Sequence, residues 1–236
     1  MTISKLAAAL TALLALSACA TQPEIPYDRN AEQSNKTIGL LTPGWPSGPT
    51  SFLASEPGQS FGLVGALIDA ARQSNRDKDL EKIIAAHNLD LRAQFVTRLS
   101  ANLESKGYKV VAVSADATRS SFAKKYPGAA EGIDSYLDVA VPIYGYMAAG
   151  IGADSPYRPW FAAGAKLVRA NDAHVLMQDR VVYNTIGEAK NVITLSPDPQ
   201  YAFPKWNDVE AAPDRAVAGM QDAADKSADT IANLLK

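Results

Sequence analysis

Residues 136–147, Tyr-Leu-Asp-Val-Ala-Val-Pro-Ile-Tyr-Gly-Tyr-Met, decide the fold class. Large aliphatic residues occupy every second position from 137 to 143, and residues of mixed polarity lie between them. Such alternation is typical of a β-strand with one face in the core. The predicted core face carries Leu137, Val139, Val141 and Ile143. Pro142 has no N–H to donate to a ladder, so it predicts a sheet edge or a β-bulge at that point.

The segments on either side of this strand predict the rest of the sheet. Residues 160–170 and 174–184 alternate in the same way around Asn171-Asp172-Ala173, which predicts a β-hairpin. Two short apolar runs, residues 37–41 and 108–114, predict further strands.

Two helices are expected beside these strands. The first covers residues 90–106, with Asp90 as its N-cap and Gly107 just after its last turn, and the second covers residues 214–236. The predicted fold is therefore α/β, of the α+β sandwich type. It has a mixed, largely antiparallel sheet of about five strands, with helices packed on one face.

Residues 36–236 are expected to form a single domain with loop or helical insertions at 44–86 and 185–208. Trp45 lies in a proline-rich loop and is expected to fold back onto the domain, because tryptophan is mostly buried. Residues 60–72 have helical spacing but contain two glycines, each of which costs about 1 kcal/mol in a helix. Two interpretations stay open: a glycine-tolerant helix packed on the core, or a membrane or subunit contact through Phe61, Val64 and Leu67.

The N-terminus carries the only cysteine, Cys19, directly after the small residues Ser17 and Ala18. Lys5 and the uncharged residues 6–16 precede it, as in a signal peptide, and this run is about half of the roughly 20 residues that a membrane span needs. The stretch resembles the lipobox of bacterial lipoproteins, in which the cysteine is acylated and becomes the first mature residue. The resemblance implies a signal peptide over 1–18 and a lipidated cysteine with a flexible tether over 19–35. Because Ala20 rather than Asp follows, it also implies a periplasm-facing place on the outer membrane.

The charge balance is mild. Removal of residues 1–18 takes away one of the 23 basic residues and none of the 25 acidic ones, so the formal net charge changes from −2 to −3. Nucleic acid is therefore not an expected partner. With Cys19 acylated no thiol is left, which excludes disulfides and cysteine-based metal sites.

The chain contains no recognisable catalytic pattern. Its two histidines, His87 and His174, have no partner at metal-ligand spacing, and His87 is expected to stabilise a helix end through the dipole. Asp134 and Asp138 would lie about 13 Å apart on a strand, too far to share a proton, and are expected to be solvated edge residues. No enzymatic activity, cofactor or metal is expected.

Aromatic residues gather between residues 136 and 161, next to an arginine. Tyrosine, tryptophan and arginine are enriched in protein–protein interfaces, which predicts a partner-binding surface. The same composition is typical of strand ends packed beneath a loop, and both interpretations stay open. The candidate surface comprises Tyr144, Tyr146, Tyr157, Arg158 and Trp160.

The order of these elements resembles the periplasmic lipoproteins built on an anticodon-binding-like α/β domain. They include the curli secretion channel's periplasmic domain, the lipoprotein of the Pel exopolysaccharide system, a cell-wall-synthase activator and the Tol N-terminal domain. The matching parts are the strand at 37–41, the helix that ends at Gly107, the strand from Asp134 to Val139, the hairpin and the C-terminal helix.

The resemblance implies binding, assembly or activation rather than catalysis. The expected function is a lipid-anchored cell-envelope protein that binds other envelope proteins in export, surface assembly or envelope maintenance. The alternative is a subunit of a homo-oligomeric ring or secretion pore in the outer membrane. An envelope hydrolase is a third hypothesis, which the missing site residues disfavour.

Overall fold

The structure is a computed structural model that describes residues 23–31, 35–54, 62–130, 132–151, 154–186 and 190–236. For residue 31 and residues 62–68 it describes the backbone only. Cys19 and the predicted signal peptide lie outside these ranges. In the described ranges, no helix is both long and apolar enough to span a membrane.

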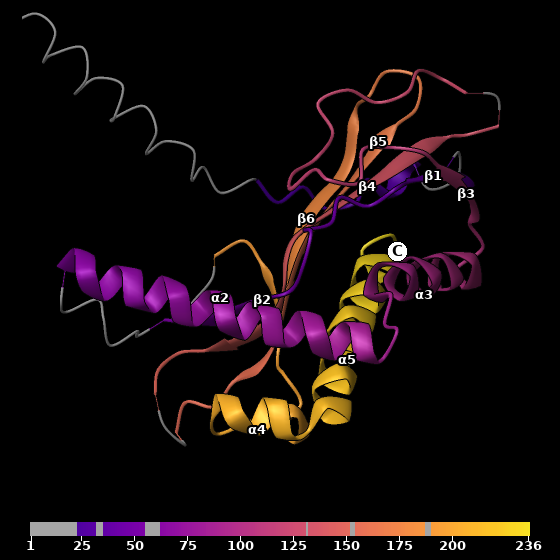
Figure 1. The fold of residues 1–236 in the computed structure, drawn as a ribbon. Coiled ribbons are helices and arrows are strands. Elements are labelled where there is room, and N and C mark those ends of the chain that lie inside the picture. Colours follow the sequence, from indigo (N-terminus) through magenta and orange to yellow (C-terminus); the bar gives the residue numbers. More distant parts are fainter. Residues whose placement is uncertain (1–22, 32–34, 55–61, 131, 152–153, 187–189) are drawn as a thin grey trace, which may run out of the picture.

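A mixed sheet forms the centre of the molecule (Figure 1). In the described ranges it has seven strands instead of the expected five or so. The path through it is β3-β1-β4-β5-β6-β7, and β2 also pairs with β4. The long central pairs β4–β5 and β5–β6 are antiparallel, while the shorter flanking pairs are parallel. The strands are β1 (Thr37–Leu41), β2 (Thr50–Leu53), β3 (Lys109–Val113), β4 (Ser135–Ala148), β5 (Arg158–Arg169), β6 (Val175–Tyr183) and β7 (Ile193–Leu195).

The two additional strands, β2 and β7, come from the two segments that the sequence assigns to insertions. β1, Gly44 and β2 follow one another along the same edge of β4, with Gly44 bonded to Val139 and Val141 between the two strands. The β4–β5 register shifts between Ala140 and Ile143, which confirms the bulge predicted from Pro142.

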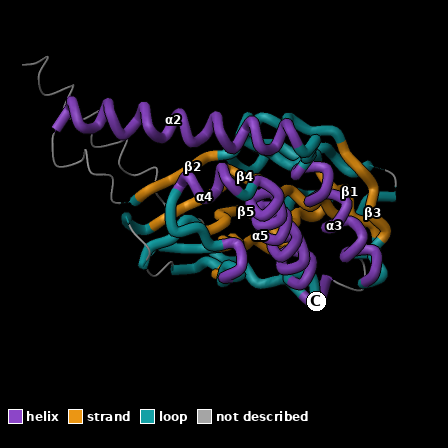
Figure 2. Tube along the Cα trace, turned by 60° about the horizontal axis from the view of Figure 1, so that its bottom comes forward, coloured by secondary structure: helices purple, strands orange, loops and turns teal. Residues whose placement is uncertain are grey.

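The helices are α2 (Gly62–Ala86), α3 (Leu91–Ser105), α4 (Trp206–Ala211) and α5 (Pro213–Asn233), with short 3-10 turns at Arg29–Ala31 and Pro199–Tyr201. Helices α3 and α5 pack on one face of the sheet, as expected (Figure 2). Asp90 caps α3 by accepting a hydrogen bond from the N–H of Ala93. Helix α2 is continuous and extends beyond the sheet at its N-terminal end (Figure 1).

The main core lies between the sheet and α3 and α5. Trp45 folds back into it, as predicted, and its ring centroid lies 5.6–5.7 Å from those of Phe95, Tyr144 and Phe161. On the opposite face of the sheet, a smaller cluster around Tyr136 and Val168 is covered by the segment between β3 and β4, to which Tyr126 and Ile133 belong.

The predicted flexible tether differs from the structure at residues 23–31. Ile25 and Gln178 of β6 exchange two backbone hydrogen bonds of 2.7 and 2.9 Å, and the N–H of Asp28 donates to Leu176. The Tyr27 side chain packs against the main core. This part of the segment belongs to the fold because it occupies an edge of β6 that would otherwise be unpaired.

Candidate functional site: an open sheet edge beside a groove

Strand β3 forms one edge of the sheet. It pairs with β1 on one side, and within the described part of the chain no strand pairs with its other side. The N–H of Lys109 donates to the Lys36 carbonyl, and the Val113 carbonyl accepts from Thr42, both at 2.8 Å. In a parallel ladder alternate residues bond to the same neighbour, so the backbone groups of Val110 and Ala112 point to the open side.

The position of β3 follows from the end of α3. Gly107, at φ 89°, takes the left-handed conformation that ends many helices. Its N–H donates to the Glu104 carbonyl at 2.9 Å, and the N–H of Tyr108 donates to that of Leu103 at 3.2 Å. The chain therefore reverses within three residues, and β3 runs back beside the helix that precedes it.

A groove of about 630 Å³ lies between this edge and α3. Its apolar lining includes Val96 on the helix and Val110 and Ala112 on the strand, while Arg92 and Glu104 bring charge to it. Because the groove directly adjoins the unpaired backbone, a chain added to β3 would place side chains in it. The full lining is Leu40, Leu41, Thr42, Pro43, Asp90, Arg92, Ala93, Val96, Ser100, Glu104, Val110, Ala112, Val113 and Ser114.

The helix wall of the groove is held by polar contacts on its other side. Arg98 makes a two-pronged contact with Asp229 of α5, at 2.6 and 2.9 Å. The hydrogen bond from Arg98 holds the pKa of Asp229 below its usual range. Gln94 donates to Asp225 at 2.9 Å in the same helix pair. These contacts join the side of α3 that faces away from the groove to α5.

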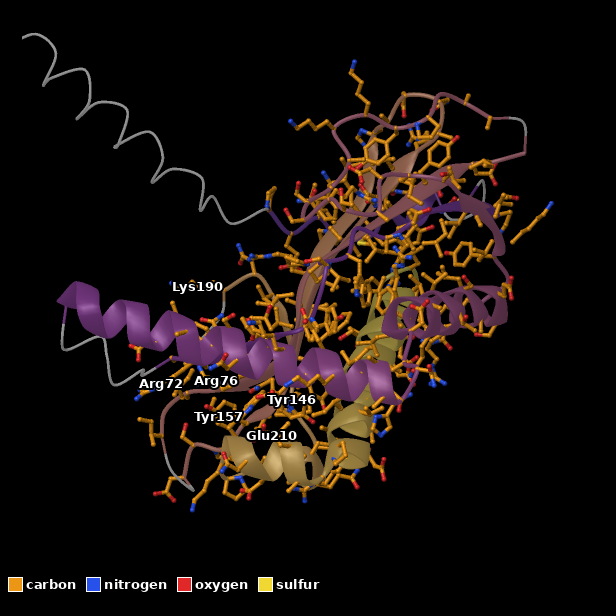
Figure 3. The ribbon with its side chains drawn as sticks, in the orientation of Figure 1. Arg72, Arg76, Tyr146, Tyr157, Lys190 and Glu210 are labelled. Atoms are coloured by element: carbon orange, nitrogen blue, oxygen red, sulfur yellow. The ribbon has the colours of Figure 1, made fainter. Side chains whose placement is uncertain are left out.

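The predicted aromatic surface is wrong for three of its five residues. Tyr144, Tyr146 and Tyr157 are 7%, 0% and 8% exposed. Tyr146 donates from its hydroxyl to the Ala216 carbonyl, and Tyr157 packs on Trp206; both tyrosines are labelled between α2 and α4 in Figure 3. The interpretation as packed strand ends holds for them, because the helices cover this face.

Arg158 and Trp160 are half-buried. The Trp160 ring lies 5.7 Å from that of Phe52, which is 37% exposed, so this pair is partly open to solvent. A partner contact through these two residues stays a prediction. Of the other predicted contact residues, Phe61 lies outside the described ranges, whereas Val64 and Leu67 belong to α2, with the backbone alone described.

The prediction that Asp134 and Asp138 are solvated is wrong for Asp138, whereas Asp134 is half-buried. Asp138 is fully buried and accepts hydrogen bonds from Arg119, the N–H of Ala123 and the hydroxyl of Tyr126. Burial, together with the neighbouring Asp138, raises the pKa of Tyr126. Asp134 accepts from the N–H groups of Lys36 and Thr37, at 2.9 and 2.8 Å. Both carboxylates hold backbone segments in place.

His87 follows the end of α2 and joins it to α5. Its two ring nitrogens lie 2.7 Å from the Ile83 carbonyl and from the Asp214 carboxylate. The hydrogen bond with Asp214, and then that with Ile83, raises the pKa of His87. Among the described residues, no group of three or more His, Cys, Asp and Glu side chains could hold a metal ion.

Sequence reasoning missed the groove at β3. The run Val110-Val111-Ala112-Val113 is as apolar as an interior strand, so nothing in it indicates an edge. The only local signal is Lys109, a residue type that proteins often place on edge strands.

No protein-family model and no curated protein matches the chain. Among solved structures it is similar to the PelC dodecamer from Paraburkholderia phytofirmans, with 10% identity over 90% of this chain and 94% of that chain and a TM-score of 0.39. A putative neuraminyllactose-binding hemagglutinin homolog from Helicobacter pylori is 14% identical over 92% and 88%, with a TM-score of 0.35. A lipoprotein from Neisseria meningitidis is 15% identical over 66% and 82%, with a TM-score of 0.23.

The protein families that the sequence resembles include the lipoprotein of the Pel system, and one of these similar structures is a PelC protein. Likeness at these values carries no ligand, partner or assembly over to this chain. The resemblance to the curli, synthase-activator and Tol proteins stays a prediction.

Proposed function

We propose that this chain is a lipid-anchored protein of the bacterial cell envelope that binds an extended segment of another envelope protein along strand β3. The observation that carries the proposal is the open edge of β3 beside the groove. Strand addition derives affinity from backbone hydrogen bonds and specificity from pockets for alternate side chains. The backbone of Val110 and Ala112 offers the bonds, and the groove along α3 offers the pockets.

The anchor is proposed from Cys19, which follows Ser17 and Ala18 at the end of an apolar run. Labelling cells with a palmitate analogue tests it. The wild-type chain is expected to carry the label and to fractionate with the outer membrane, and Cys19→Ala to lose both. Label on Cys19→Ala would contradict the anchor.

Site-specific photo-crosslinking tests the binding site. A crosslinking amino acid at Ser100 lies in the groove, whereas the neighbouring position Ala101 is exposed and outside its lining. We expect a discrete adduct from position 100 alone. Equal adducts from both positions would overturn the proposed site.

Ala112→Pro sharpens this experiment. Because the N–H of Ala112 points away from β1, proline removes a donor for the partner and leaves the β1–β3 ladder intact. The adduct is therefore expected to disappear while the thermal midpoint stays close to that of the wild type. Ala112→Ser keeps the N–H and is the matched control.

The mass of the adduct distinguishes the two functional hypotheses. An adduct with a different protein supports the proposed function. An adduct with a second copy of this chain, together with a defined oligomer in light scattering, would replace it with the ring hypothesis.

A further inference from the structure

The described part of the chain begins at Pro23, four residues after the proposed lipid anchor. The Pro23 carbonyl accepts a hydrogen bond of 2.8 Å from the Gln178 side chain of β6. Two residues later, Ile25 forms an isolated antiparallel bridge with the same glutamine. Both contacts lie on β6, so this strand holds the first residues that the structure describes.

Further contacts hold the segment after Ile25. The Tyr27 side chain packs against the main core, and its hydroxyl lies 3.4 Å from that of Tyr108. Asn35 donates to the Tyr27 hydroxyl at 3.2 Å and accepts from Ser135 of β4 at 2.7 Å. The segment is thus held at β6 and again next to the starts of β3 and β4.

These contacts limit the reach of the domain from the membrane. Cys19 and Pro23 are four residues apart, and a fully extended chain covers about 3.3–3.6 Å per residue. The leash, meaning the segment from Cys19 to Pro23, therefore spans at most about 14 Å. A free tether from Cys19 to Asn35 would cover 16 residues and reach about 56 Å. Docking of residues 23–31 therefore shortens the possible reach about fourfold.

We infer that the β6–β7 edge of the domain faces the phospholipid surface and that the β3 edge, with its groove, points away from it. This inference rests on the proposed acylation of Cys19. Four strand spacings of about 4.8 Å separate β6 from β3, so the groove lies about 19 Å farther along the sheet than the attachment point. The orientation leaves the binding edge accessible to periplasmic partners while the lipid anchor holds the opposite edge.

The charges around the attachment point have both signs. Glu24 is close enough to Asp179 to contribute to its raised pKa, after the larger effect of burial. Arg180 donates to the Lys190 and Asn191 carbonyls, and the Lys190 side chain is exposed (Figure 3). Such a mixed surface has little preference for anionic lipid, so the covalent leash sets the orientation. We expect the orientation to depend weakly on salt.

Energy transfer to a lipid dye tests the inference with the full lipidated protein in vesicles of phosphatidylethanolamine and phosphatidylglycerol. One donor is attached at Lys190→Cys, on the β6 side, and another at Glu104→Cys, beside the groove; acylation occupies Cys19 in both. We expect higher transfer from position 190 than from position 104. Equal transfer, or higher transfer from position 104, would overturn the inferred orientation.

Lengthening the leash provides the matched control. An insertion of about 16 Gly and Ser residues after Thr21 behaves as a flexible coil and keeps the anchor. The difference in transfer between the two positions is then expected to be lost. A difference that survives the insertion would show that the leash does not set the orientation.

The experiment separates failure of the orientation from failure of the anchor. If Cys19 carries no lipid, the protein will not sediment with the vesicles, and the proposed anchoring fails. If it sediments but the two positions transfer equally, the anchor stands and the orientation is wrong.

Discussion

The guanidinium of Arg119 lies 2.6 Å from the Asp138 carboxylate and forms a buried ion pair on the face of the sheet opposite to α3 and α5. Arg119 also donates to the carbonyls of Thr42, Asp116 and Val139. The pair therefore joins the segment after β3 to the C-terminal end of β1 and to the middle of β4.

Removing one partner of this pair should destabilise the protein strongly. Arg119→Met leaves a buried carboxylate without its countercharge, which costs about 3–5 kcal/mol. The double variant Arg119→Met/Asp138→Leu removes both charges and should recover much of this loss. Urea unfolding of the chain without residues 1–18 measures the difference. If the two single effects simply add in the double variant, the ion pair is not coupled as described.

Trp45→Ala should cost about 3–5 kcal/mol of folding stability, because it removes a large side chain from the main core. Its ring contacts Phe95, Tyr144 and Phe161. Trp160→Ala is the control, since its contact with the partly exposed Phe52 is of a kind that contributes about 0.5–1.5 kcal/mol. Urea midpoints of the two variants compare them. A larger loss for the Trp160 variant would contradict the position of Trp45 in the main core.

Gly145→Ala should be the most harmful of three glycine substitutions. Gly145 has φ 143°, and a Cβ there would collide with the Thr50 carbonyl of the paired strand β2. At Gly107 a Cβ meets no atom within 4 Å, so Gly107→Ala carries only the backbone cost of about 1–2 kcal/mol. Gly128→Ala has neither problem and should be almost neutral. Thermal midpoints of the three variants should follow this order, and a Gly145 variant as stable as the wild type would refute the close β2–β4 approach.

The contact between His87 and Asp214 should make stability depend on pH. The pKa of His87 is raised above the ordinary 6.5, mainly by the hydrogen bond with Asp214, so folding favours its protonated form. Its contribution is then fully present below about pH 6.5 and is lost as the pH rises through the folded-state pKa. NMR titration of the imidazole should show Asp214→Asn lowering the pKa of His87. An unchanged titration curve would mean that this contact does not form in solution.

Sequence patterns predicted the strands and helices that have local signals. The alternation of apolar and polar residues predicted β4, β5 and β6. Asp90 and Gly107 marked the two ends of α3, and Pro142 indicated the bulge in β4. Strands β2 and β7 are only four and three residues long and exist because they pair with β4 and β6. Their segments contain prolines and no period of their own, which is why local patterns indicated loops.

The candidate site was harder to predict than the elements that form it. The tyrosines at 144 and 146 have the composition of an interface, but Tyr144 packs on Trp45 and Tyr146 is bonded to helix α5. The β3 run has the composition of an interior strand, but the strand order leaves it at an edge.

The sequence by itself determined the position of Cys19 at the end of an apolar run, the types of the regular elements and the burial of Trp45. These properties depend on residue type and on the spacing of neighbours along the chain. Only the tertiary structure decided that Asp138 is buried with Arg119, that residues 23–31 attach to β6 and that the edge of β3 stays open. The physical reason is that each depends on which distant segments pair, and a local pattern specifies one face of a strand without specifying its neighbours.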